Sequence, residues 1–261
     1  MAGKEEKSDI LSVGYHAMPA GSHERLFRHE DSHWWCRTVR RITLDALARH
    51  GIARNGLIID AGCGSGGLLR EISEYGNALG VELAAEALRF AASATGVPLL
   101  RANVRRLPFV DNCADAVVAL DLLCNMEGDF EVETLMEIRR VLRPRGLLFM
   151  NLPAHRFMAG AHDLRMGVRR RYETSDIINF TTESGFRILE LFHWNLVLMP
   201  GAYLMRKLTS LTAGDSYSDL ALTPRWLDPF LFQFMRVDVT FCRLIRSPLG
   251  ISIFCVAERK D

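Results

Sequence analysis

The stretch Leu57-Ile58-Ile59-Asp60-Ala61-Gly62-Cys63-Gly64-Ser65-Gly66-Gly67 joins a short apolar run to an acid and a glycine-rich turn. The next residues, Leu68-Leu69-Arg70-Glu71-Ile72, carry apolar side chains at helical spacing. Strand, glycine turn and helix is the simplest structure for this pattern. In a sheet of parallel strands, such a turn lies at the carboxyl end of a strand, where ligands bind.

Beyond this turn, short apolar runs alternate with longer helical segments. Further strands are expected over 78–81 (ending at Glu82), 98–101, 115–120, 146–152, 186–192 and 251–258. Helices are expected over 84–94, 130–142 and 174–184. This alternation indicates an α/β fold with a doubly wound, mostly parallel sheet and helices on both faces.

The segments outside this pattern divide the chain. Residues 1–50 are expected to form a polar tail and, from Ser22 to about His50, a helical cap. Residues 51–195 and 248–261 form the core, and 196–247 form an apolar helical insertion in the same domain. The insertion holds two apolar segments, Leu196–Leu208, interrupted by Pro200-Gly201, and Trp226–Ile245. They could enlarge the core, wall an acceptor pocket or form a homodimer contact, or lie on a membrane surface.

Composition excludes several classes of protein. The 261 residues carry 32 Lys and Arg against 31 Asp and Glu, a net charge of +1, which argues against a protein that binds nucleic acid. No apolar run is long enough for a membrane-spanning helix, and residues 1–14 lack the apolar core of a secretory signal. The six scattered cysteines contain no CxxC pair and indicate reduced thiols. A cytoplasmic location is expected, with peripheral membrane contact as an option.

The glycine turn is suited to a nucleoside. Glycines let the backbone approach a ligand closely, and Glu82, twenty residues after Gly62, could accept the ribose hydroxyls. Gly62, Gly64 and Gly67 also satisfy the G-x-G-x-x-G dinucleotide pattern, so a nicotinamide cofactor is an alternative. Asp60, just before the glycines, instead favours a ligand with a positive charge.

A further motif follows the third expected strand: Asn103-Val104-Arg105-Arg106-Leu107-Pro108-Phe109. Together with the glycine turn and Glu82, it makes residues from about Leu57 to Pro153 resemble the class I S-adenosylmethionine-dependent methyltransferases of type 11. The resemblance implies strand order 3-2-1-4-5-7-6, with strand seven antiparallel, and S-adenosylmethionine as the cofactor. It places the methionyl part near Asp60, Gly62 and Gly64, the ribose on Glu82 and the adenine at Asn103 and Val104. Many relatives have Asp at the position of Asn103. The remaining cofactor contacts implied are Cys63, Leu83, Leu120 and Asp121, the last two closing over the methionyl side.

An aromatic segment precedes this region. His29-Glu30-Asp31-Ser32-His33-Trp34-Trp35-Cys36-Arg37, with Arg40-Arg41, resembles the E-x-x-H-W-W-F-x-x-R-R segment of a bacterial subgroup, except for Cys36 in place of Phe. Such proteins often accompany gene clusters for surface glycans or natural products. The resemblance implies a lid in which Trp34 and Trp35 cover the cofactor, while Arg37 or Arg40 pairs with its carboxylate. Alternatively, the tryptophans anchor the helix on the sheet.

The methyl acceptor is expected beyond strands four and five. His162, with Asp163 orienting it, is the first candidate general base, and His155 is the second. Arg170, Arg171 and Tyr172 could grip the acceptor or lock the loop. The region resembles the subgroup's P-A…H-D…G-H-x-R-R-Y pattern, but Val168 stands where the second His is usual. No metal is expected, because Asp115, Asp121, Glu127 and Asp129 form no recognisable ligand set.

These observations predict an enzyme that transfers a methyl group from S-adenosylmethionine to an oxygen or nitrogen of a small molecule of glycan or natural-product type. The alternative is a protein that keeps the nucleoside site without turnover, for which Val168 is the best hint.

Overall fold

A single seven-stranded sheet organises the computed structural model, which describes residues 22–52, 55–126, 130–160, 163–164, 166–211 and 224–261. The strands are β1 (Leu57–Ala61), β2 (Asn77–Glu82), β3 (Leu99–Arg101), β4 (Ala114–Leu120), β5 (Leu142–Pro153), β6 (Phe186–Trp194) and β7 (Ser252–Arg259). Their order is β3-β2-β1-β4-β5-β7-β6, and β7 is antiparallel to both neighbours. The predicted order and the predicted direction of the last strand are confirmed.

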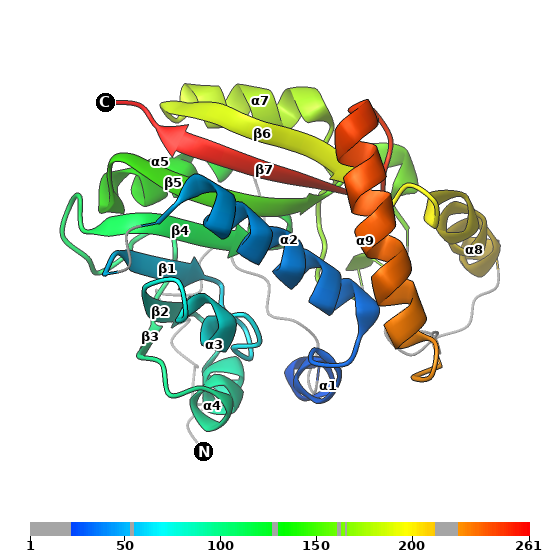
Figure 1. The fold of residues 1–261 in the computed structure, drawn as a ribbon, viewed down its shortest axis with the longest axis horizontal. Helices are drawn as coiled ribbons and strands as arrows, with labels where there is room; N and C mark the ends of the chain where they lie inside the picture. Colours follow the sequence, from blue (N-terminus) through cyan, green and yellow to red (C-terminus); the bar gives the residue numbers. More distant parts are fainter. Residues whose placement is uncertain (1–21, 53–54, 127–129, 161–162, 165, 212–223) are drawn as a thin grey trace, which may run out of the picture.

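Helices cover both faces of the sheet (Figure 1). They are α1 (Ser22–His29), α2 (Trp34–His50), α3 (Leu69–Ile72), α4 (Ala85–Ala94), α5 (Glu131–Val141), α7 (Thr174–Glu183), α8 (Met199–Leu211) and α9 (Asp228–Ile245). Two short 3-10 turns, Leu123–Asn125 and Arg156–Met158, follow β4 and β5.

The alternation of side chains along each strand makes two apolar cores. Ile58, Val118 and Phe149 face α2 and α3, whereas Ile59, Val117 and Met150 face α5 and α7. Because the central strands are buried on both faces, their sequences are almost continuously apolar, as expected for a parallel sheet between helical layers.

Three local expectations differ from the structure. The helical pattern from Ser22 to about His50 is two helices, because the chain turns at residues 30–33 and His33 caps α2 through its ring nitrogen. Strand β5 begins at Leu142, which pairs with Ala114 across an irregularity in register, instead of at Gly146. Pro200 does not interrupt a helix but lies in the first turn of α8, where its missing N–H costs nothing.

The insertion packs at the end of the sheet where β1, β4 and β5 terminate (Figure 1). Its helix α9 lies against α2 and β6. The Asp228 carboxylate accepts the Trp34 N–H at 3.2 Å, and the Asp238 carboxylate accepts the N–H groups of residues 195–197 at 2.7–3.2 Å. Both acids of α9 therefore serve to fix the helix to the core.

Candidate functional site

The glycine turn after β1 is tied to the end of β2. The N–H groups of Gly62 and Cys63 both donate to the Val81 carbonyl, at 2.8 and 3.0 Å. Gly62 and Gly64 have φ of +79° and +54°, a region that other residues enter at a steric cost. A Cβ on Gly62 would also lie 2.9 Å from the Leu122 side chain. The two glycines thus allow a tight turn that leads directly into the next helix.

Glu82, at the end of β2, organises the same turn. Its Oε2 accepts the Gly64 N–H at 3.1 Å, and its Oε1 accepts the N–H groups of Leu83 and Ala84 at 2.7 and 2.8 Å. A carboxylate offers about four acceptor positions. A ribose hydroxyl could therefore bind at the remaining position, or at one that a backbone N–H gives up.

Asp60 is buried at the base of the turn, with 4% of its surface exposed. Burial first, and then the charges of Glu82 and Glu30, raise the pKa of its carboxyl from 3.8 to about 7. Among the residues that the structure describes, none donates a hydrogen bond to this carboxylate. A carboxylate held without a cation or donor suits a ligand that brings its own positive charge.

A second such acid follows β4. Asp121 has φ of +49°, and the Asn151 amide donates to both of its carboxylate oxygens at 3.1 and 3.0 Å. Burial raises the pKa of Asp121 to about 7, although Asn151 and Arg171 act in the opposite direction. Leu120, beside it, is half-buried and packs on the core. No local pattern indicated Asn151, because its partner Asp121 follows the neighbouring strand β4.

The predicted adenine contacts lie after β3. Val104 is buried, and the Asn103 Oδ1 accepts the Arg105 N–H at 3.0 Å, which is a local side-chain turn. The amide oxygen expected to accept from an adenine amine therefore already accepts from a backbone N–H.

The N-terminal cap contacts the glycine turn directly. Ser65 Oγ donates to Glu30 at 2.8 Å, and the Arg40 guanidinium donates to the Gly67 carbonyl and to Asp31, both at 3.0 Å. Arg40 therefore holds the turn together, whereas the resemblance assigned it or Arg37 to the cofactor. Glu30 and Arg40 are ten residues apart in the sequence, but nothing near either residue indicated that Arg40 would contact Gly67.

The remaining cap residues point toward the insertion and the sheet. The Arg37 guanidinium lies 4.1 Å from the centre of the Phe232 ring of α9. Trp35 stacks on Trp194 at 6.1 Å, which fits the anchoring alternative for that residue. Trp34 is half-buried, and its indole Nε1 has no hydrogen-bond partner among the described residues. The lid role of Trp34 and the carboxylate-pairing role of Arg37 stay predictions.

His155 is buried just past β5 and takes part in an aromatic stack. Its ring is sandwiched between Phe157 at 5.2 Å and His193 at 5.1 Å, the two imidazoles being almost parallel. Glu173 Oε2 lies 3.2 Å from His155 Nδ1, and within the described part of the chain His155 Nε2 has no hydrogen-bond partner. The backbone of His155 has φ of +60°, a strained conformation of the kind that gathers at functional sites. Glu173 and His193 were not identified from the sequence.

The neighbouring imidazole is held neutral. Burial, and then the charge of His155, lower the pKa of His193 to about 4, and His193 Nδ1 lies 3.1 Å from the Ser247 carbonyl. A neutral ring stacked on His155 adds no permanent positive charge to it. The carboxylate of Glu173 is thus the charged group in hydrogen-bond contact with this histidine.

The other predicted acceptor residues form internal pairs. Arg171 donates to both oxygens of Asp163 at 2.7 Å and to the Ala154 carbonyl at 2.8 Å, and both side chains are buried. Tyr172, also buried, donates to Glu131 at 3.0 Å, and Arg170 binds the same carboxylate at 3.0 Å. These contacts match the loop-locking alternative. His162, the first candidate base, lies outside the described residues.

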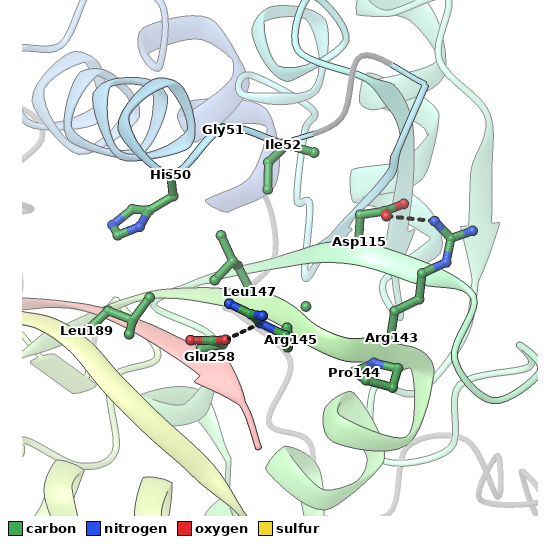
Figure 2. A pocket seen from close by; sticks show the side chains of 11 residues that line it. His50, Gly51, Ile52, Asp115, Arg143, Pro144, Arg145, Leu147, Leu189 and Glu258 are labelled. Carbon is green, nitrogen blue, oxygen red and sulfur yellow. Dashed lines mark hydrogen bonds and ion pairs between the residues drawn. The ribbon is translucent and has the colours of Figure 1, made fainter. Parts of the chain in front are cut away.

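A cavity of about 340 Å³ lies at the opposite, amino-terminal edge of the parallel strands (Figure 2). Its charged walls are already paired, Arg143 with Asp115 at 2.6 Å and Arg145 with Glu258 at 3.3 Å. Each acid has a cation beside it, in contrast to Asp60. This cavity therefore lacks the unbalanced charge found at the glycine turn.

Comparisons with known proteins find similarity to methyltransferases. Residues 59–150 match a family model described as "Methyltransferase domain". Over 187 residues, the chain is 25% identical to cycloartenol-C-24-methyltransferase of Arabidopsis thaliana, a match that covers 55% of each chain. The chain thus spans about half the length of that relative.

Solved structures share the fold across nearly the whole chain. A SAM-dependent methyltransferase from Thermotoga maritima matches with a TM-score of 0.56 and 16% identity, over 92% of this chain and 95% of that one. The [4+2]-cyclase SpnF matches with a TM-score of 0.58 and 18% identity, over 95% and 98%. At these identities, the similarity establishes the fold alone.

Proposed function

We propose that this chain, whose residues 59–150 match a methyltransferase domain, is a class I methyltransferase that transfers a methyl group from S-adenosylmethionine to an oxygen or nitrogen atom of a small molecule. One observation carries the proposal: the buried Asp60 carboxylate, with its raised pKa, lies at the turn that Glu82 organises. S-adenosylmethionine brings a sulfonium, an ammonium and a ribose, which are the groups that such a pair of acids can bind.

The residues of the glycine turn fit this cofactor. Asp60 and Asp121 would meet its positive charge, Glu82 would accept from the ribose, and Asn103 with Val104 would contact the adenine. When bound, the cofactor supplies an activated methyl group for in-line displacement. The protein contributes mainly alignment, for which roughly 7–11 kcal/mol is available.

His155 is the described residue best suited to remove a proton from the acceptor. With Nδ1–H directed at Glu173, the unpartnered Nε2 carries the lone pair and can accept a proton. As that proton arrives, the Glu173 carboxylate stabilises the positive imidazolium. A hydroxyl or amine acceptor releases a proton when it is methylated, and such a group could take it. His162 stays a second candidate for the same role.

Binding and turnover test the proposal separately. Calorimetry with S-adenosylmethionine should show binding, and turnover should then be measured with sugars, phenols, amines and sterols, the last because of the cycloartenol relative. Glu173→Gln should lower kcat about tenfold or more, and His155→Gln about 100-fold or more, with cofactor affinity unchanged. Arg156→Gln, a change in an exposed neighbour that pairs with Asp176, is the matched control.

Failure to bind S-adenosylmethionine would refute the proposal. Binding without turnover on any acceptor would instead favour the nucleoside-binding alternative. Wild-type turnover in His155→Gln would remove His155 as the base and return that role to His162.

A further inference from the structure

Helix α9 has two faces of different character. Its inner face is buried on the core through Met235, Asp238 and Cys242. Its outer face carries large apolar side chains that the described structure leaves exposed: Phe230 68%, Phe234 43%, Val237 67%, Phe241 49% and Leu244 81%. We call these five residues the α9 stripe.

The stripe is continuous along the helix. Its members are spaced by four, three, four and three residues, so at about 100° per residue they fall within an arc of about 80°. At ~1.5 Å per residue the stripe is about 21 Å long. A row of this kind is larger than the single exposed apolar residues normal for protein surfaces, and indicates a contact surface.

The exposed charges on α9 and at its two ends are of one sign. Arg225 precedes α9, Arg236 lies beside its middle and Arg246 follows it, and all three are exposed. The acids of the described part of the insertion are Asp228 and Asp238, and both are buried and bonded to backbone N–H groups. The outer surface of α9 is therefore apolar along the centre and positive around it.

This charge pattern argues against a second copy of the chain as the occupant. A two-fold axis near Val237 would place Arg236 of both copies on the same side of the contact. An antiparallel pair of α9 helices would also set Arg225 of one copy beside Arg246 of the other. The acids of α9 are turned inward in both copies, so no carboxylate on this helix would compensate the repulsion.

We propose that the α9 stripe docks this protein onto an anionic lipid surface, with the Phe and Leu side chains in the acyl boundary and the arginines at the headgroups. An amphipathic helix with aromatic residues on one side and basic residues around it binds membranes in this way. The proposal concerns the outer surface of α9, and stands whether or not the methyl-transfer proposal holds.

Binding of the full chain to vesicles tests the proposal. The protein should float with vesicles of phosphatidylcholine mixed with phosphatidylglycerol, and less so with phosphatidylcholine alone. Phe234→Ser/Phe241→Ser should reduce the partition coefficient at least tenfold. Arg236→Gln and Arg246→Gln should each reduce it about fivefold, the ratio that corresponds to ~1 kcal/mol per basic residue.

Matched controls come from α5 and α4. Met136→Ser and Arg89→Gln change an exposed apolar and an exposed basic side chain on helices outside the insertion, and should leave partition unchanged. A second readout needs no change to the stripe. Trp226 lies just before α9 and is 69% exposed. Brominated phosphatidylglycerol should quench the fluorescence of Trp226, and Trp226→Phe should remove that quenching.

Three results would overturn the proposal. They are failure of the folded wild-type protein to bind anionic vesicles, equal binding to neutral and anionic vesicles, and a wild-type dimer in sedimentation that Phe234→Ser/Phe241→Ser converts to a monomer. The last result would assign the stripe to a second copy of the chain.

Discussion

Asp60→Asn should separate the contribution of this carboxylate to folding from its contribution to binding. The pKa of Asp60 is raised from 3.8 to about 7 by burial and by Glu82 and Glu30. Since each pKa unit corresponds to ~1.4 kcal/mol, the ionised carboxylate opposes folding by roughly 4 kcal/mol. The pKa of Asp60 is higher in the folded than in the unfolded protein. The folded protein therefore has its full stability below about pH 4, where Asp60 is protonated in both states. It loses roughly 4 kcal/mol of this stability as the pH rises to about 7, and does not regain it above that pH.

Asparagine removes the ionisation but leaves a buried amide without a partner, at a cost of about 1–3 kcal/mol. At pH 8 the variant should be about 2 kcal/mol more stable than the wild type, because ~4 kcal/mol of ionisation penalty is removed against ~2 kcal/mol for the amide. At pH 4.5 the variant should be about 1 kcal/mol less stable, because the wild type there carries only ~1 kcal/mol of that penalty. For a domain of this size, 2 kcal/mol is a Tm change of about 4–8 °C. The change in sign between the two pH values is the distinctive result.

Calorimetric unfolding of the ligand-free protein from pH 4.5 to 8 measures this effect. The exposed Asp45→Asn on α2, where Asp45 pairs with Arg41, is the control and should show little pH dependence. Asp60→Asn should also weaken S-adenosylmethionine about 10- to 100-fold, because a charge-assisted bond of roughly 1.5–3 kcal/mol is lost. Destabilisation at pH 8 equal to that at pH 4.5, or unchanged cofactor affinity, would refute the reasoning.

Three further substitutions test neighbouring assignments. Trp34→Ala should weaken cofactor binding tenfold or more by calorimetry if Trp34 is a lid, and unchanged affinity in a folded variant would leave it an anchor. Tyr172→Phe should lower the free energy of unfolding by about 1–3 kcal/mol in denaturant titrations, because Glu131 loses a buried donor. Turnover should be retained. A large fall in kcat at unchanged stability would instead give Tyr172 a part in the reaction. Arg171→Ala should destabilise by about 3–5 kcal/mol, because the buried Asp163 carboxylate loses both of its 2.7 Å bonds to Arg171 and Arg206 lies farther away, at 3.7 Å; a change below about 1 kcal/mol would contradict a loop-locking pair.

Much of the fold could be predicted from local pattern. Glycine turns, apolar runs and helical spacing are features of neighbouring residues, so β1, the turn and the order of elements followed from them. The strand order needed the family resemblance as well, since periodicity does not say which strands pair. The break between α1 and α2 was missed because the apolar residues of both helices share one spacing pattern, whereas the break depends on the His33 cap.

The parts that could not be predicted depend on contacts between distant residues. His155 follows β5 and His193 lies in β6, so the two rings meet only because the sheet brings these segments together. Arg40 reaches Gly67 from the cap, and nothing beside either residue indicates the contact. The sequence showed that Arg171 and Asp163 were candidates for function, but whether they bind a ligand or each other depends on burial, which a local pattern does not contain.

The most direct test of the central claim is a calorimetric titration of the full chain and of Glu82→Gln with S-adenosylmethionine and with NAD. We predict one S-adenosylmethionine bound per wild-type chain, at least tenfold weaker binding to Glu82→Gln, and no heat from NAD. Binding of NAD in place of S-adenosylmethionine, or equal S-adenosylmethionine affinity in the two proteins, would contradict the assignment of the glycine turn and its acids.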